Sequence, residues 1–216
     1  MKHSGILYCR VMICAVFTLP LCGCISVSNT PAPRFYMLSG VDNNQVSQKF
    51  AIPQDVIIAV GPVKIPDYQN RPQIVTQNKN KMLTFAQFDR WGEPLDMGLA
   101  RSILENLTLM LPEASLGIFP CNFAIPVKYQ VIADVIQLES DLNGDMFLVV
   151  RWSVINAKNN TMLITKRSEF RQAINPHSYS GLTVALSKAC VLLSNEIAES
   201  LAALVKQPET TNAQSR

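Results

Sequence analysis

Histidine is scarce in this chain, with two copies among 216 residues. His3 lies in an N-terminal segment that we expect to be removed, so His177 is the only histidine of the predicted mature chain. A Ser–His–Asp or Cys–His site would have to use His177, yet no Gly-x-Ser-x-Gly elbow or reactive-cysteine context accompanies it. The spacing of cysteine and histidine does not fit a zinc site. The sequence therefore predicts neither nucleophilic catalysis nor a bound metal.

Glycine and charged residues are also sparse. The nine glycines form neither a Gly-Lys-Ser/Thr phosphate loop nor a GxGxxG turn, so we expect no nucleotide or other cofactor. Charged residues make up 16% of the chain and form no run of one sign. Removal of residues 1–23, with Lys2 and Arg10, leaves 17 of the 19 basic side chains against 16 acidic ones. This balance argues against a nucleic-acid partner, which requires a concentrated basic surface.

Four carboxylates could in principle supply an acid–base pair, namely Asp67, Asp89, Glu93 and Asp96. Charged loop ends and helix caps explain these positions better. Asp96 falls in the first turn of a predicted helix, where a negative charge suits the helix dipole. We therefore do not expect an enzyme.

The first residues have the pattern of a bacterial lipoprotein signal. Lys2 and Arg10 supply positive charge, and the apolar run 11–22 is about a dozen residues long, whereas a spanning helix needs ~20. Residues 21–24 (Leu-Cys-Gly-Cys) resemble a lipobox with a small residue just before the cysteine. We expect cleavage after residue 23 and acylation of Cys24. An ordinary signal peptide with incidental cysteines is the alternative.

A triacylated Cys24 would hold the protein stably on a membrane, because two or more acyl chains anchor where one does not. Ile25 follows in place of the Asp that retains lipoproteins at the inner membrane, which favours the periplasmic face of the outer membrane. Residues 24–33 are a predicted tether of at most ~35 Å. We expect one domain over 34–207 and a disordered tail over 208–216.

Two cysteines remain in the predicted domain, Cys121 and Cys190. In an oxidising compartment they could form a disulfide, which would stabilise by ~4 kcal/mol in the chain-entropy model. Cysteine is also among the most buried residue types, so two buried free thiols are the alternative.

Apolar periodicity predicts two amphipathic helices, over 94–111 and 179–206. Alternating and β-branched runs predict strands at 34–39, 55–65, 74–76, 82–85, 115–119, 129–139, 146–157 and 161–170. Asn143-Gly144 is a strong hairpin turn, so the last three strands form an antiparallel meander. The expected fold is α/β: a single three-layer domain with a mixed β-sheet and two main helices.

Two segments, 61–75 and 88–96, are rich in the residue types that dominate interfaces. Trp91, between Arg90 and Glu93, could be an exposed binding anchor. Alternatively, Trp91 packs the start of the helix onto the sheet while Arg90 pairs with Asp67 or Glu93. Spacing alone does not separate these two interpretations.

These segments also carry a family resemblance. The chain resembles the PqiC-type auxiliary lipoproteins of ABC-type and MCE-type transport systems, through RFYML, VGPVKIPDYQNRPQIV, RWGEPLD and YSGLTVALSKACVLLSNEIAESLA. The resemblance implies a non-enzymatic role at the outer membrane, docking an MCE protein that conducts lipids between membranes, and assembly as a homo-oligomeric ring. Candidate contact residues, because they fall in the motifs, are Asp67, Tyr68, Arg71, Arg90, Trp91 and Glu93. The alternative is a periplasmic carrier with its own lipid pocket.

Overall fold

The computed structural model describes residues 30–40, 48–78, 80–121 and 125–206. The predicted signal segment, Cys24 and the predicted tail lie outside the described residues. Chain contacts separate a unit Met1–Pro31 from a unit Ala32–Arg216. The fold described below belongs to the second unit.

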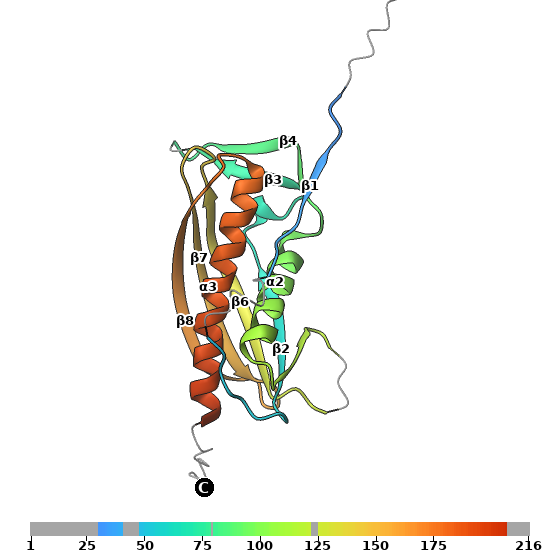
Figure 1. The fold of residues 1–216 in the computed structure, drawn as a ribbon, viewed down its shortest axis with the longest axis vertical. Coiled ribbons are helices and arrows are strands. Elements are labelled where there is room, and N and C mark those ends of the chain that lie inside the picture. Colours follow the sequence, from blue (N-terminus) through green and yellow to red (C-terminus); the bar gives the residue numbers. More distant parts are fainter. Residues whose placement is uncertain (1–29, 41–47, 79, 122–124, 207–216) are drawn as a thin grey trace, which may run out of the picture. The chain divides into compact units, whose positions relative to one another are not determined.

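A five-stranded mixed sheet forms the body of this unit, in the order β5-β2-β6-β7-β8 (Figure 1). Its strands are β2 (Ile57–Lys64), β5 (Ser115–Ile118), β6 (Tyr129–Ser140), β7 (Asp145–Asn156) and β8 (Thr161–Ala173). Strand β2 pairs in parallel with both β5 and β6. Strands β6, β7 and β8 pair antiparallel, which confirms the predicted meander.

Two helices, α2 (Leu95–Met110) and α3 (Tyr179–Lys206), pack against the sheet and against each other. The predicted α/β class, with a mixed sheet and two amphipathic helices, is confirmed. The two helices are in mutual contact and lie on one face of the larger sheet (Figure 1). The opposite face carries charged side chains such as the ion pair Arg151–Asp134.

A second, three-stranded sheet has the order β1-β4-β3 and is called the small sheet below. Its strands are β1 (Arg34–Tyr36), β3 (Gln73–Gln77) and β4 (Leu83–Trp91), and the short 3-10 helix η2 (Asp67–Gln69) precedes β3. The predicted hairpin between β3 and β4 is present. Pro66 and Pro72 bracket η2 and cannot donate to a ladder, so β3 does not continue the larger sheet.

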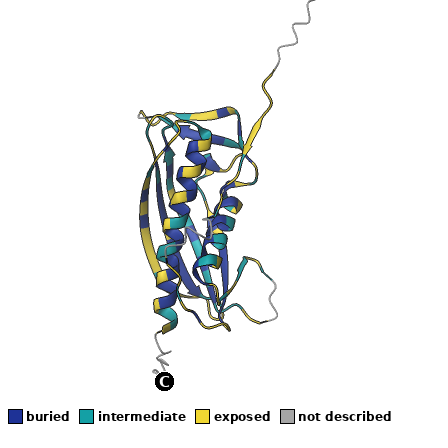
Figure 2. Cartoon of the chain, viewed as in Figure 1, coloured by how far each residue is buried: buried dark blue, intermediate teal, exposed yellow. Residues whose placement is uncertain are grey.

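The core lies between the helices and the larger sheet (Figure 2). Trp152 and Leu107 are fully buried there. On β6 the predicted inward residues Tyr129, Val131, Ala133 and Val135 are all buried. The alternation then shifts between Val135 and Gln137, so that Leu138 rather than Gln137 enters the core. A bulge of this kind moves side chains to the other face and is invisible to strict alternation.

Helix α3 is long and apolar enough to cross a membrane by composition alone. However, 67% of its most apolar window is buried inside the fold. In this structure α3 is therefore a core helix, whose apolar stripe is already occupied by α2 and the sheet.

Candidate functional site

The candidate contact residues taken from the sequence gather around the small sheet. Asp67 and Tyr68 lie in η2, and Arg71 lies just before β3. Arg90 and Trp91 end β4, and Glu93 lies between β4 and α2. Segments far apart in sequence thus meet at one end of the larger sheet, where β3 contacts β6.

One face of the small sheet is built around a buried carboxylate. Arg34 donates from Nε and Nη2 to Asp89, at 2.8 Å for each bond, and the Tyr36 hydroxyl donates to the same carboxylate at 2.8 Å. The Arg34 hydrogen bonds hold the pKa of Asp89 below its ordinary value, although burial opposes them. This cluster joins β1 to β4, so the carboxylate of Asp89 is structural rather than catalytic.

Tyr179, the first residue of α3, lies near this cluster. Burial and the neighbouring Asp89 charge raise its pKa. Burial also raises the pKa of Tyr36, and its hydrogen bond to Asp89 adds to the shift. Both phenols therefore stay protonated at neutral pH, and Tyr36 keeps the proton that it donates.

Trp91 is a core residue rather than an exposed anchor. Its side chain is 7% exposed and belongs to the hydrophobic core together with Leu95 and Leu99. The interpretation that Trp91 packs the start of α2 onto the fold is therefore the one that the structure supports. The alternation of β4 places Trp91 on the same face as Asp89, which points away from solvent.

Arg90 makes no ion pair with Asp67 or Glu93 among the described residues, contrary to that part of the packing interpretation. Glu93 instead pairs with Arg101 of α2, through bonds of 2.9 and 2.7 Å from Nε and Nη2. Arg101 also donates to Glu105 and to the carbonyl of Leu38, each at 2.7 Å. The half-buried Glu93 carboxylate thus holds the Arg101 side chain, and Arg101 attaches α2 to the backbone at Leu38.

The opposite face of the small sheet, called the outer face, is exposed. In the strand register Arg90 lies opposite Phe35 on one side and Gln73 on the other. Val75 lies opposite Phe85, but the register shifts between Gln73 and Val75, so alternation does not relate Phe85 to Arg90. The register sets Phe35 and Arg90 on the same side of the sheet. Burial shows that Phe85 faces outward, because Phe85 is 47% exposed while its neighbour Ala86 is buried.

The Arg71 guanidinium stacks over the Phe85 ring, 4.4 Å from its centroid, although Phe85 remains 47% exposed. We call the exposed residues Asp67, Arg71 and Phe85, together with the half-buried Arg90, the docking surface. Phe85 is absent from the sequence candidates, since an aromatic residue in a short hairpin gave no sign of which way it points. Tyr68 is half-buried, and its hydroxyl donates to the Leu138 carbonyl at 3.3 Å, which attaches η2 to β6.

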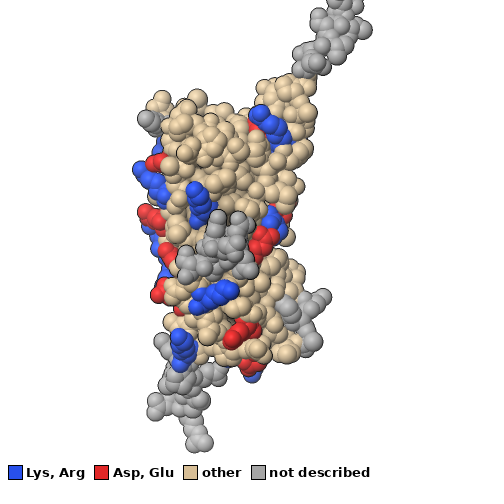
Figure 3. Space-filling view, in the orientation of Figure 1, with Lys and Arg blue, Asp and Glu red and all other residues tan. Residues whose placement is uncertain are grey.

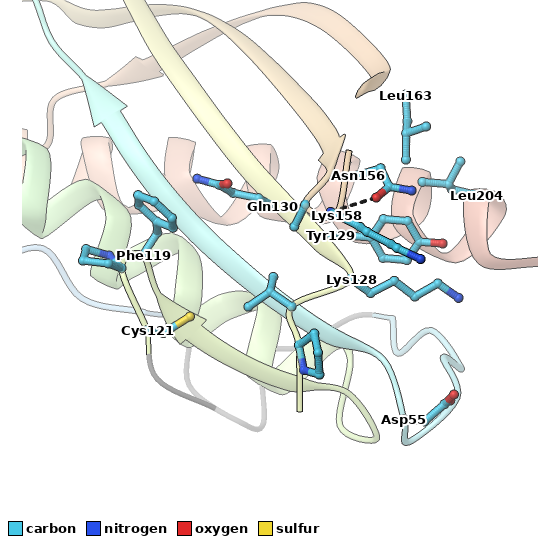
Figure 4. A pocket seen from close by; sticks show the side chains of 14 residues that line it. Asp55, Phe119, Cys121, Lys128, Tyr129, Gln130, Asn156, Lys158, Leu163 and Leu204 are labelled. Carbon is cyan, nitrogen blue, oxygen red and sulfur yellow. Dashed lines mark hydrogen bonds between the residues drawn. The ribbon is translucent and has the colours of Figure 1, made fainter. Parts of the chain in front are cut away.

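An open hollow of about 1100 Å³ lies at the end of the larger sheet where β6 begins and α3 ends (Figure 4). Lys128, Lys158, Leu163 and Leu204 lie along one side, and Phe119 and Cys121 along the other (Figure 4). The hollow mixes apolar surface with lysines. It contains none of the residues that the motifs singled out.

The described residues do not form a metal centre. No group of three or more His, Cys, Asp or Glu side chains in that part of the chain could hold a metal ion. His177 Nδ1 lies 2.9 Å from the Leu142 carbonyl, in an exposed position. Of the four carboxylates considered for an acid–base pair, Asp89 and Glu93 each form an ion pair with an arginine.

Both thiols of the domain are free, so the structure does not contain the disulfide considered above. Cys190 is fully buried in α3, and burial raises the pKa of its thiol to about 12. Cys121 lies at the rim of the hollow instead (Figure 4).

Charges are spread over the surface. On the visible face, basic and acidic side chains alternate along the edge that β8 occupies, and broad areas carry neither sign (Figure 3). Strand β8 is a long edge strand, and charged residues on such a strand discourage pairing with a further strand.

Comparison with solved structures finds the same fold at low sequence identity. A protein from Xanthomonas campestris of the DUF330 family superposes with a TM-score of 0.62 at 11% identity, covering 79% of this chain and 95% of that one. An uncharacterised protein superposes with a TM-score of 0.64 at 17% identity, covering 79% and 99%. No curated protein matches the chain significantly.

A family model matches residues 36–198, which include α2, most of α3, the larger sheet and most of the small sheet. Its description is ABC-type transport auxiliary lipoprotein component. The family is one of membrane-anchored accessory proteins rather than enzymes, in agreement with the dispersed carboxylates and histidine. The chain belongs to the family of ABC-type transport auxiliary lipoprotein components.

Proposed function

We propose that this protein is the outer-membrane lipoprotein subunit of an MCE-type intermembrane lipid transport system. The acylated Cys24 anchors it to the periplasmic face, and the folded domain docks the periplasmic MCE tunnel protein and so supports envelope integrity. The observation that carries this proposal is the family match over residues 36–198. The PDYQNRPQIV and RWGEPLD motifs support the MCE system in particular, because they carry the resemblance to PqiC-type proteins.

The docking surface has the composition expected of a protein-binding site. Arg71 is held flat against an exposed aromatic ring, and arginine and aromatic side chains are enriched among the residues that dominate binding energy. Arg90 brings a second guanidinium whose Nε atom is buried without a hydrogen-bond partner. A hydrogen bond from such a donor to an acceptor of the partner protein stabilises a complex more than a bond from a donor that already has a partner.

A ring of identical subunits is part of the proposal, because the resemblance implies homo-oligomers around a tunnel. A closed ring needs a heterologous contact that repeats from subunit to subunit. Native mass spectrometry of the detergent-extracted protein should give one defined multiple of the subunit mass. A monomer at all concentrations would contradict the ring, while leaving the docking proposal open to its own test.

Crosslinking in the native cell tests the docking proposal. We expect an MCE-domain protein to be recovered with the lipoprotein, and Arg71→Ala to reduce its recovery. Arg171→Ala is the matched control, because Arg171 of β8 also lies over an aromatic ring, 5.8 Å from the Phe147 centroid, and is outside the docking surface. Equal recovery of the MCE-domain protein with both variants would contradict a docking role of Arg71. Trp91→Ala is unsuitable for this test, since it would disturb the core.

The alternative function is a periplasmic lipid carrier, and the open hollow is the observation that favours it. A carrier would retain lipid after purification away from all partners. Mass spectrometry of the protein, with its covalent acyl chains distinguished by mass, should then find a bound phospholipid. Recovery of the protein with lipid but without any MCE-domain protein would replace the docking proposal by the carrier.

A further inference from the structure

Three exposed apolar side chains lie where the described chain enters the fold. Phe35 is 64% exposed, Met37 is 55% exposed and Met97 is 48% exposed. We call these three residues the anchor-side patch. Single exposed apolar residues are normal on a protein surface, so their grouping is what requires an explanation.

Alternation explains why Phe35 and Met37 share a side. Tyr36 is half-buried and Leu38 is 3% exposed, so both point toward the fold. In an extended segment the residues between them point away, where polar side chains would be expected. Instead this segment presents an aromatic ring and a thioether to solvent.

Contacts with α2 place Met97 beside them. Arg101 donates to the Leu38 carbonyl at 2.7 Å, and Gly92 donates to the Tyr36 carbonyl at 2.7 Å. Met97 precedes Arg101 by four residues and so lies one turn along the same face of the helix. A side-chain carbon added at Gly92 would lie 2.9 Å from the Met37 side chain, which confirms that residues 37 and 92 are close. The patch therefore spans β1 and the first turn of α2.

The covalent chain limits how far this patch can lie from the membrane. About ten residues separate Cys24 from Arg34, and a chain of that length reaches at most ~35 Å. Pro31 and Pro33 restrict the last part of the connection. No other exposed apolar group in the described structure lies closer along the chain to the anchor.

We propose that the anchor-side patch inserts into the headgroup region of the membrane that holds the acyl chains. This inference rests on the proposed acylation of Cys24. Aromatic and flexible apolar side chains are suited to that region.

The contact gives the domain an orientation. Acyl chains on a flexible tether fix the position of a protein but leave it free to rotate. With β1 against the bilayer, β3 lies on the other side of β4, and the Arg71–Phe85 stack stands away from the membrane. The docking surface is then presented to a partner that approaches through the periplasm.

Quenching of tryptophan fluorescence by brominated lipid tests this contact. The acylated full-length protein is reconstituted in vesicles of phosphatidylethanolamine and phosphatidylglycerol, with plain or brominated acyl chains. The variants are Phe35→Trp and, as a control, Met162→Trp, because Met162 is 60% exposed on β8. We expect the emission added by Phe35→Trp to fall about twofold in brominated vesicles, since interfacial side chains sit ~5–10 Å into the boundary region. The emission added by Met162→Trp should remain.

Equal emission from Phe35→Trp in both kinds of vesicle would overturn the contact, provided that the protein floats with the vesicles. Protein that does not float would instead contradict the proposed anchor. Met37→Trp repeats the measurement if Phe35→Trp folds poorly. The emission added by Phe35→Trp could instead change with protein concentration and not with brominated lipid. That result would identify a second copy of the chain as the molecule that covers the patch, and it would overturn the membrane contact. Vesicles contain no MCE protein, so the result is independent of the docking proposal.

Discussion

Single residues near the small sheet have roles that their burial and partners decide. Asp89 and Glu93 have the same charge and lie four positions apart, and both bind arginine, but Asp89 is buried beneath β1 while Glu93 is half-exposed. Trp91 looks like a binding anchor in the sequence but packs in the core. Arg71 looks like a loop residue but stacks on an exposed ring. Partners, rather than residue type, separate structural from functional side chains here.

The Asp89 cluster should make stability depend on acid pH. In the folded protein the pKa of Asp89 lies below its ordinary value near 3.8. At a pH between these two values the unfolded chain therefore binds a proton at Asp89 that the folded protein does not bind. The stabilisation is present above the unfolded pKa and is lost as the pH falls through the folded pKa. Urea unfolding over a pH series should show this loss in the wild type, and Asp89→Asn should reduce it. Identical acid profiles would contradict the role of the cluster.

The two thiols should react differently. Cys190 is fully buried and burial raises its pKa to about 12, so thiolate is scarce at neutral pH. We expect a maleimide to label Cys121 in the native protein and Cys190 only after denaturation, as mass spectrometry can count. Cys121→Ser serves as the control and should leave no native labelling. If neither thiol reacts after denaturation without reductant, the two cysteines form a disulfide after all.

At the scale of elements, the contact between α2 and α3 joins the middle of the chain to its last helix. Leu107 of α2 is fully buried. A buried polar pair lies in the same contact, where Asn106 donates to Ser194 at 3.3 Å. Ser102 of α2 donates instead to the carbonyl of Ser39, which follows β1, at 3.2 Å. Satisfied polar groups of this kind set the alignment of the helices while the leucines supply most of the stabilisation.

Two leucine substitutions should show that stability depends on the inner surfaces of the helices and not on their outer surfaces. Leu107→Ala should lower the free energy of unfolding by about 2–5 kcal/mol, because it leaves a cavity in a packed core. Leu192→Ala, at a position 45% exposed on α3, should change it by no more than about 0.5 kcal/mol. Denaturant unfolding of both variants measures the difference. Similar losses for the two would show that the α2–α3 contact is less tightly packed than the structure indicates.

At the scale of the whole molecule, the domain should owe its membrane attachment to the acyl chains. Helix α3 has the composition of a membrane span, yet its apolar stripe is used inside the fold. Replacing residues 1–24 by a cleavable signal without a lipidated cysteine should therefore release the folded domain into the periplasmic fraction. Fractionation followed by a salt and alkaline wash measures this, with the wild type as the membrane-bound reference. Retention of the released form in washed membranes would contradict it.

The local sequence was enough to predict most of the helices and strands and the family of the protein. Both helices, the meander and the β3–β4 hairpin follow from apolar spacing, prolines and the Asn143-Gly144 turn. Neighbouring residues decide these features, because period and turn geometry are local properties. Of the two segments rich in interface residue types, 61–75 and 88–96, the structure places most residues in or beside the small sheet, while residues 61–64 belong to β2. Their role in binding stays a prediction.

Only the tertiary structure decided which side chains of those segments face the solvent. The division of the strands into two sheets, the inward turn of Trp91 and the stacking of Arg71 on Phe85 all depend on pairing between distant strands. The pairing of Arg34 with Asp89 joins residues 55 positions apart. The sequence shows the alternation of each strand, but pairing with a distant strand decides which of the alternating side chains face the core. A bulge of one residue moves the side chains that follow it to the opposite face of the sheet.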